Sequence, residues 1–220
     1  MQMEKIICAN GDSFTDEYYL SSQDRWTNIL GINENLSLAG VSNERIFNTT
    51  IKYLNNNRPD IMIIGWTDWG RYMLPCNDGN YYFITSHHTG IEQVEPKEFD
   101  QSVGKFYFKH LHNDYLNFEN LLNYIIFTQD YCVKNNIKIL NFFSTVDQRW
   151  LDEHTLSEIS ETTKQKQRLE DLIEKIDSKH WINKKFYSMY EHCKDFPKDD
   201  TNHPGKEGSK HWAQLVKKYL

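Results

Sequence analysis

An apolar run at residues 6–9 ends abruptly at the sequence Asn10-Gly11-Asp12-Ser13. Such a run is typical of a buried strand that enters a tight turn. In an open α/β sheet this turn lies at the carboxyl edge, where ligands bind. A helix that begins there directs free N–H groups at any anion formed beside Ser13. Gly-Asp-Ser is also ordinary turn chemistry, so Ser13 is either a nucleophile or a helix-capping serine.

Length, charge and cysteine content restrict the classes of protein. The chain has 220 residues, which fits a single domain over residues 1–220. Its net charge of -6 argues against binding to nucleic acid or to acidic membranes. No apolar run approaches the ~18–20 residues of a membrane helix, and the first residues lack a secretory-signal layout. The four cysteines have neither zinc nor disulfide spacing. We expect a cytoplasmic protein, and a virion component assembled in a cytoplasm would look the same.

Strands and helices are predicted to alternate along the chain. Apolar runs predict strands at residues 6–9, 35–39, 61–64 and 137–143, and helical periodicity predicts helices at 25–30, 42–56, 114–135, 155–176 and 206–219. This alternation favours a parallel sheet with helices on both faces. Residues 66–113 are aromatic and polar without a clear period. We expect a long excursion at the carboxyl edge there, with a small hairpin at 81–84.

A second polar cluster precedes the last predicted helix. It reads Asp200-Thr201-Asn202-His203-Pro204. A histidine at this place can reach the carboxyl edge as a general base, and an acid three residues earlier can contact its other ring nitrogen. Asp199 is a rival acid. The alternative interpretation is a plain acidic turn with a helix-capping histidine.

Three blocks together resemble the SGNH (GDSL-like) hydrolase family. They occur in that family's order and span nearly the whole chain: Gly11-Asp12-Ser13-Phe14, Gly40 before Ser42-Asn43, and Asp200-x-x-His203-Pro204. The resemblance implies a flavodoxin-like, three-layer α/β/α sandwich with a mostly parallel, five-stranded sheet. It also implies a serine esterase or acyl hydrolase that needs no metal or other cofactor.

The resemblance assigns roles to individual residues. Ser13 becomes the nucleophile, His203 the base and Asp200 the acid that orients it. The backbone N–H groups of Ser13 and Gly40 become two donors of the oxyanion hole, the site that stabilises the negative oxygen of the intermediate.

One block departs from the family pattern. The family usually shows Gly-x-Asn-Asp after the third strand, where this chain reads Gly65-Trp66-Thr67-Asp68. Thr67 therefore stands where the third oxyanion donor belongs, and a hydroxyl has only one hydrogen to donate. Asn43 is the alternative donor. Loss of one such donor typically costs ~10²–10³ in turnover.

Several polar and aromatic residues are candidates for contacts with substrate: Asp12, Asn43, Trp66, Asp68 and Arg71. The guanidinium of Arg71 either binds a substrate carboxylate or forms a structural ion pair, with Asp68 or another acid. The aromatic rings either stack on a sugar or pack the excursion onto the domain; they belong to Trp66, Trp69 and Tyr72. The pairs His87-His88 and His110-x-His112 lack supporting ligands, so we expect no metal site.

These observations predict a serine-dependent ester hydrolase that works through an acyl-enzyme. The polar, aromatic excursion and the lack of a large apolar lid favour a small acyl group, such as acetate on a carbohydrate or similar polar ester. Two alternatives remain: a catalytically weak glycan-binding or structural module, and an acyltransferase. The expected partner is a small-molecule or glycan ester, and the oligomeric state is not predicted.

Overall fold

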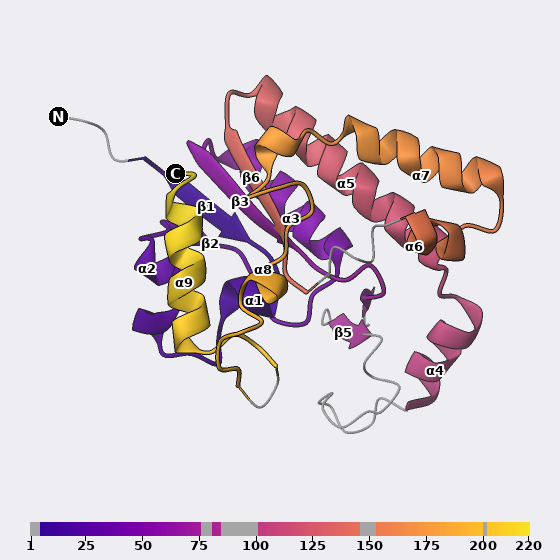
Figure 1. The fold of residues 1–220 in the computed structure, drawn as a ribbon, viewed down its shortest axis with the longest axis horizontal. Helices are drawn as coiled ribbons and strands as arrows, with labels where there is room; N and C mark the ends of the chain where they lie inside the picture. The colour runs from indigo at the N-terminus through magenta and orange to yellow at the C-terminus, as the bar shows by residue number, and fades with distance from the viewer. Residues whose placement is uncertain (1–4, 76–80, 85–100, 146–152, 200–201) are drawn as a thin grey trace.

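The chain folds into a parallel sheet covered by helices on both faces (Figure 1). The computed structural model describes residues 5–75, 81–84, 101–145, 153–199 and 202–220. The strands are β1 (Ile7–Asn10), β2 (Glu34–Asn35), β3 (Ile61–Trp66) and β6 (Lys138–Phe143), in the order β2-β1-β3-β6. All three neighbouring pairs are parallel, and Ala9 lies opposite both Asn35 and Ile63. The predicted three-layer α/β/α class is confirmed.

The longer helices agree with the periodicity of the sequence. The helices of four or more residues are α1 (Ser13–Asp16), α2 (Trp26–Ile29), α3 (Asn43–Asn56), α4 (Gln101–His110), α5 (Asp114–Lys134), α6 (Glu153–Ile159), α7 (Thr163–Lys175), α8 (Met189–His192) and α9 (Lys206–Lys217). The helix predicted at 155–176 is two helices, because Thr162 caps α7 with a reciprocal Gln165 bond. Among the described residues, no helix is long and apolar enough to cross a membrane.

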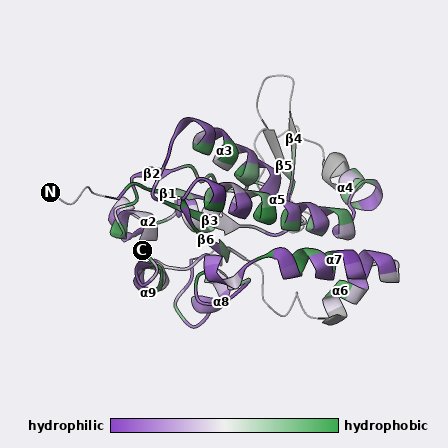
Figure 2. Ribbon diagram, turned by 90° about the horizontal axis from the view of Figure 1, so that it is seen from above, coloured by the Kyte–Doolittle hydropathy of each residue, from purple (hydrophilic) through white to green (hydrophobic). Residues whose placement is uncertain are grey.

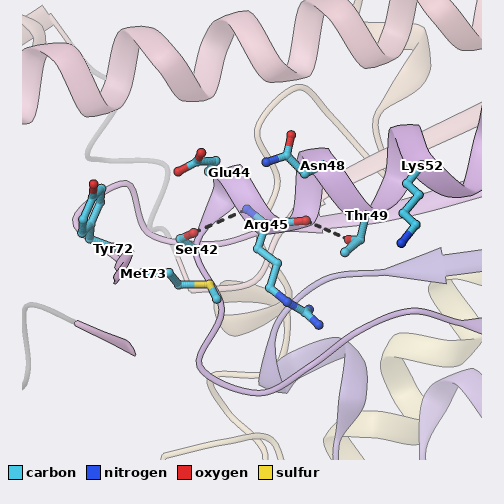
Figure 3. A pocket seen from close by; sticks show the side chains of 8 residues that line it. All are labelled: Ser42, Glu44, Arg45, Asn48, Thr49, Lys52, Tyr72 and Met73. Carbon is cyan, nitrogen blue, oxygen red and sulfur yellow. Dashed lines mark hydrogen bonds between the residues drawn. The ribbon is translucent and has the colours of Figure 1, made fainter. Parts of the chain in front are cut away.

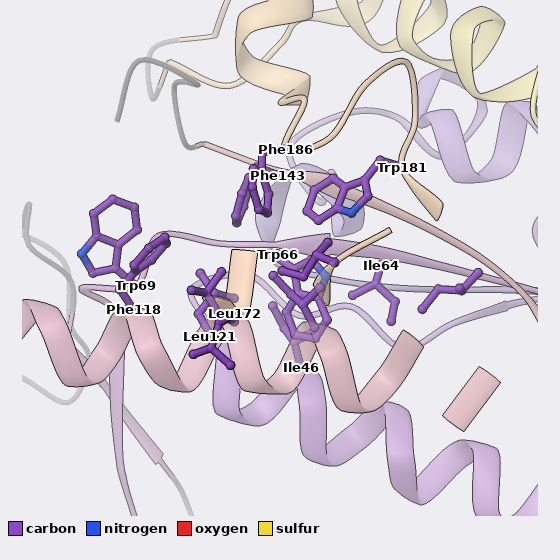
Figure 4. Packing of buried hydrophobic residues seen from close by; sticks show 14 of the residues in the cluster. Ile46, Ile64, Trp66, Trp69, Phe118, Leu121, Phe143, Leu172, Trp181 and Phe186 are labelled. Atoms are coloured by element: carbon purple, nitrogen blue, oxygen red, sulfur yellow. The ribbon is translucent and has the colours of Figure 1, made fainter. Parts of the chain in front are cut away.

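Both faces of the sheet are buried, and successive strand residues alternate between two apolar layers. Met62 and Ile64 of β3 face α3 and α5, whereas Ile61 and Ile63 face α2, α8 and α9. Figure 2 shows α3 and α5 on one side of the sheet and α8 and α9 on the other. The apolar layer between the sheet and helices α3 and α5 contains large aromatic side chains, Trp66 among them (Figure 4). This packing holds the carboxyl ends of β1 and β3 beside each other.

The expected fifth strand is replaced by irregular chain. Isolated parallel bridges join β6 to later residues at Asn141–Trp181 and Phe143–Ser188. The carbonyl oxygen of Asn141 accepts from Ile182 N at 3.0 Å. The sheet therefore has four strands within the described residues rather than five, because this segment bonds to the edge of β6 at intervals without an extended ladder.

The excursion at residues 66–113 contains regular structure. The predicted hairpin at 81–84 is present, since β4 (Tyr72–Pro75) pairs antiparallel with β5 (Tyr81–Ile84). Helix α4 follows and leads into α5. The prediction missed β4 and α4 because their apolar residues are interleaved with polar aromatics.

The turn after β1 and the end of β3 approach each other too closely for side chains. A Cβ on Gly65 would lie 2.6 Å from Cζ of Phe142 and 2.7 Å from Oγ1 of Thr15. A Cβ on Gly11 would lie 2.2 Å from the same Thr15 oxygen. Glycine at both positions therefore allows the turn after β1 to pack directly on β3.

We expect Gly65→Ala to lower the free energy of unfolding by about 1–3 kcal/mol, because the new methyl group overpacks the contact with Phe142. Urea unfolding measures the loss. The same substitution in a Phe142→Leu background should cost less, since that change removes the ring atoms nearest the new Cβ. Equal costs in both backgrounds would contradict the proposed clash.

Candidate active site

The strand β1 ends at a buried asparagine that fixes the following turn. Asn10 Nδ2 lies 3.0 Å from the carbonyl oxygen of Ile46 and 2.8 Å from the hydroxyls of both Thr49 and Thr50 on α3. Its Oδ1 accepts from the backbone N–H of Gly11 at 2.9 Å. The turn is thereby bonded to α3, and the residues after it have a defined direction.

Ser13 and His203 are brought together at this turn. Ser13 begins α1 and is 5% exposed, while His203 lies in the loop that precedes α9. Ser13 Oγ and His203 Nε2 are 2.7 Å apart, although the two residues are 190 positions apart in sequence. The serine hydroxyl donates to the imidazole when Nε2 is the unprotonated ring nitrogen, and that is the arrangement needed for transfer of the serine proton.

The imidazole lies between aromatic rings. The ring centroid of His203 is 4.9 Å from that of Phe14 and 4.5 Å from that of Tyr19. Burial lowers the pKa of His203 from its usual value, against the carboxylates of Asp199 and Asp12, and the Arg71 cation also lowers it. His203 is therefore neutral near pH 7 and able to accept a proton.

Two adjacent residues, Asp199 and Asp200, are the candidates for an acid partner of His203. Asp200, the acid expected from spacing, lies outside the described residues. Asp199 Oδ1 is 3.7 Å from His203 Nδ1, which is longer than a hydrogen bond. The same oxygen accepts from the backbone N–H of His203 at 2.8 Å. Asp199 thus shapes the loop that carries His203, and the assignment of Asp200 stays a prediction.

Asp12, directly before Ser13, is a buried anchor for three segments. It is 0% exposed and its side-chain contacts are with the protein itself, so its contact with substrate stays a prediction. Oδ1 accepts from Phe14 N at 3.1 Å, whereas Oδ2 accepts from Thr67 Oγ1 at 2.7 Å and from Arg71 Nη1 at 3.0 Å. The Arg71 guanidinium therefore pairs with Asp12, not with Asp68, the acid named first for a structural pair.

The predicted third oxyanion donor is not available in this arrangement. The single hydrogen of the Thr67 hydroxyl is donated to Asp12, because a carboxylate can only accept. The alternative, Asn43, donates both amide hydrogens to the carbonyl oxygens of Thr67 and Asp68, at 3.0 and 3.3 Å. In this structure Thr67 and Asn43 fix the loop after β3, and their roles as oxyanion donors stay predictions.

Two further substrate candidates have structural roles. Trp66 is fully buried, and its indole N–H donates to Asn141 Oδ1 at 2.9 Å. Trp66 lies two residues after Ile64 on β3, so the two side chains share one buried face of the strand, and this spacing was the signal that Trp66 faces the core. Asp68 Oδ1 accepts from Gly70 N at 2.6 Å and closes a turn. The predicted substrate contacts of Trp66 and Asp68 stay predictions.

A cavity of about 610 Å³ lies along α3 next to this edge (Figure 3). Its lining is mostly polar: Ser42, Glu44, Arg45, Asn48, Thr49, Lys52, Tyr72 and Met73. Ser42 is two residues from Gly40, and Tyr72 follows Arg71 in sequence. Two of the residues that line the cavity are therefore sequence neighbours of candidate-site residues. Tyr72, one of the rings expected either to stack on a sugar or to pack the excursion, lines this cavity, whereas Trp69 is buried in the core.

Metal ligands are not clustered in the described part of the chain. No group of three or more histidine, cysteine or acidic side chains that could hold an ion occurs there. His112 instead contacts Asp114 Oδ1 at 3.0 Å at the start of α5. The pair His87-His88 lies outside the described residues.

Sequence reasoning missed two residues near Ser13, the half-buried Tyr19 and the buried Glu17. Tyr19 contacts the His203 ring, and Glu17 is 0% exposed at the end of α1. Glu17 Oε2 accepts from Trp26 N at 2.5 Å and lies 3.1 Å from Ser209 Oγ on α9. Glutamate side chains are normally exposed, so the sequence carries no signal for the burial of Glu17.

Comparison with solved structures gives the class of fold. The chain matches a GDSL-like lipase from Bacteroides thetaiotaomicron with a TM-score of 0.51 and 12% identity, over 100% of this chain and 89% of the lipase. It matches the esterase EstA from Pseudoalteromonas sp., inhibited by monoethylphosphonate, at 0.52 and 11% over 99% of each chain. An acetyl xylan esterase matches at 0.50 and 10%, over 98% of this chain and 100% of the esterase.

The fold is therefore that of the GDSL, or SGNH, hydrolases. The sequence itself matches no family model and no curated protein. The resemblance predicted from three short blocks is confirmed at the level of the fold, and identities of 10–12% carry the comparison no further.

Burial raises the pKa of Glu17 to about 8, against hydrogen bonds from Ser209 and Trp26. The folded protein therefore binds a proton that the unfolded chain releases near pH 4.5. We expect stability to fall as the pH rises from about 4.5 to about 8, by at most ~1.4 kcal/mol per pH unit. Glu17→Gln should remove this slope in urea unfolding measured across that range.

Glu44→Gln on the exposed part of α3 is the matched control for this substitution. It removes a carboxylate without removing a buried one, so the slope should persist. A slope that survives in Glu17→Gln would show that another group titrates.

Proposed function

We propose that the protein is a serine-dependent ester hydrolase. The observation that carries the proposal is the 2.7 Å contact between Ser13 Oγ and His203 Nε2 at the carboxyl edge of the sheet. The half-buried imidazole, whose pKa is lowered by burial, and the fold shared with esterases support it. The chain would act as one catalytic domain over residues 1–220, and the reaction needs no metal or other cofactor.

In the proposed reaction, Ser13 Oγ attacks the ester carbonyl carbon while His203 Nε2 takes the serine proton. The carbonyl electron pair moves to oxygen and forms a tetrahedral oxyanion. When this intermediate collapses, the alcohol leaves with the proton from His203 and Ser13 holds the acyl group. Water, deprotonated by His203, then attacks the acyl-enzyme and releases the acid.

Backbone N–H groups are the proposed first donors to the oxyanion. Ser13 lies in the first turn of α1, where a helix has no acceptor of its own for the N–H groups. Gly40 has a φ of 78°, a conformation that other residues rarely adopt, and it immediately precedes the turn into α3. Such preorganised donors stabilise the charge that develops in the transition state.

We propose a small acyl group, such as acetate, on a carbohydrate or similar polar alcohol. The mostly polar cavity along α3 supports a polar leaving group, since it offers hydroxyl, amide and charged side chains, and Ser42 in its lining is two residues from Gly40 in sequence. The fold shared with an acetyl xylan esterase agrees with this class of substrate.

A catalytically weak glycan-binding module is the second candidate. The engagement of Thr67 by Asp12 favours it, because the usual third donor is then absent. This role requires saturable glycan affinity without turnover, and the affinity should be indifferent to Ser13→Ala.

Purified protein treated with a fluorophosphonate should gain one adduct, located on Ser13 by peptide mass spectrometry. The reaction depends on proton transfer to His203, so His203→Ala should abolish it. His211→Ala is the matched control, because His211 lies on α9 and contacts His192 at 2.9 Å. No adduct in folded protein would contradict the hydrolase and favour the binding module.

Asp200→Asn should lower kcat by about 10²–10⁴, because an amide partner favours the wrong imidazole tautomer. Asp199→Asn should cost less than about tenfold, since its remaining side-chain oxygen can still accept from His203 N. Steady-state kinetics on a short-chain ester distinguish the two. The reverse order would assign Asp199 as the acid of the triad.

A further inference from the structure

Arg71 is placed to supply the oxyanion contact that Thr67 does not provide. It lies four residues beyond Thr67, immediately before β4. Its Nη1 donates to Asp12 Oδ2 at 3.0 Å, and Asp12 is covalently joined to Ser13. The salt bridge thus holds a cation beside the nucleophile.

The guanidinium has donors to spare. An arginine carries five N–H hydrogens on three nitrogens. Within the described part of the chain, Nη1 is the one nitrogen of Arg71 that has a hydrogen-bond acceptor. The side chain is 14% exposed, so part of it reaches the solvent side of the site while Asp12 is wholly covered. With respect to the described residues, Nε and Nη2 therefore have hydrogens left to donate to a bound molecule.

The local electrostatics agree with this position. The buried carboxylate of Asp12 also accepts hydrogen bonds from Phe14 N and Thr67 Oγ1. These bonds orient its carboxylate, which in turn orients the guanidinium. The Arg71 charge contributes to lowering the pKa of His203, so it acts within the electrostatic range of the catalytic pair.

We propose that Arg71 is a catalytic residue that donates from Nε or Nη2 to the oxyanion, in place of the side-chain amide usual at position 67. The inference rests on the proposed function. As Ser13 Oγ bonds to the carbonyl carbon, the carbonyl electron pair becomes an oxyanion that Arg71 stabilises. When the alkoxide leaves with the proton from His203, the oxyanion returns to a carbonyl. Arg71 stays protonated throughout.

This role differs from binding a substrate carboxylate. An oxyanion contact strengthens in the transition state and so acts on kcat. A carboxylate contact exists in the ground state and acts on KM for acidic substrates only. A purely structural role for the ion pair would change stability and leave kcat of the folded protein intact.

Hydrolysis of p-nitrophenyl acetate, which is neutral and small, separates these roles. Arg71→Gln should lower kcat by about 10²–10³ with little change in KM. Arg71→Lys should retain the pair with Asp12 and the fold, yet lose part of kcat because one ammonium serves two distant acceptors poorly. Arg168→Gln is the matched control, since Arg168 pairs with Glu119 between α7 and α5.

Replacement of Thr67 by asparagine gives a rescue experiment. In the Arg71→Gln background, Thr67→Asn should recover part of kcat by restoring an amide donor. The rate of Ser13 phosphonylation should fall in Arg71→Gln and recover in the double variant, because the phosphonyl oxygen occupies the place of the oxyanion.

The outcomes distinguish this inference from the proposed function. If wild-type protein neither hydrolyses the ester nor reacts with the phosphonate, the hydrolase proposal fails and the role of Arg71 fails with it. If wild type reacts through Ser13 and folded Arg71→Gln or Arg71→Lys keeps full kcat, the inference about Arg71 alone is overturned. A change confined to KM would overturn it equally.

Discussion

The geometry of the site depends on one buried carboxylate. Asp12 is wholly covered, and a buried charge is tolerated only when it is paired and hydrogen-bonded. It binds the start of α1, the residue after β3 and the residue before β4, through Phe14, Thr67 and Arg71. Ser13 is the next residue in the chain, so its position is set by these contacts. Removal of one partner from such a buried pair typically costs ~3–5 kcal/mol.

The same contacts explain how the site departs from the usual pattern. The hydroxyl of Thr67 turns inward to the carboxylate, and the amide of Asn43 is used to hold the loop backbone. What remains near Ser13 is a cation anchored by Asp12. In the proposed reaction, a fixed guanidinium and two backbone N–H groups would stabilise the negative charge that develops on the carbonyl oxygen.

Much of this could be predicted from sequence, because strand β3 and helices α3 and α5 have strong apolar patterns. The pairing of Ser13 with His203 was also expected, because each belongs to a recognisable short motif. These motifs are Gly11-Asp12-Ser13 near the start of the chain and Asp200-x-x-His203-Pro204 near its end. The direction of the Thr67 hydroxyl was not predictable, because it depends on the burial of Asp12, which only the packed structure defines. The partner of Arg71 has the same origin: Asp68 is three residues away in sequence, whereas Asp12, the acid that Arg71 contacts, is 59 positions away. The burial of Trp66 could have been predicted, because it lies two residues after Ile64 and so shares its face of β3.

The irregular segment beside β6 has a consequence for how the protein behaves at high concentration. An open sheet edge presents unpaired N–H and C=O groups on which another chain can add a strand. Here Ile182 N and Tyr187 O already bond to Asn141 and Phe143 of β6 at 3.0 and 2.9 Å. The opposite edge is β2, which has only two residues, both exposed. The apolar central strands are therefore enclosed between a covered edge and a very short one, and neither edge offers a long template for intermolecular β-pairing.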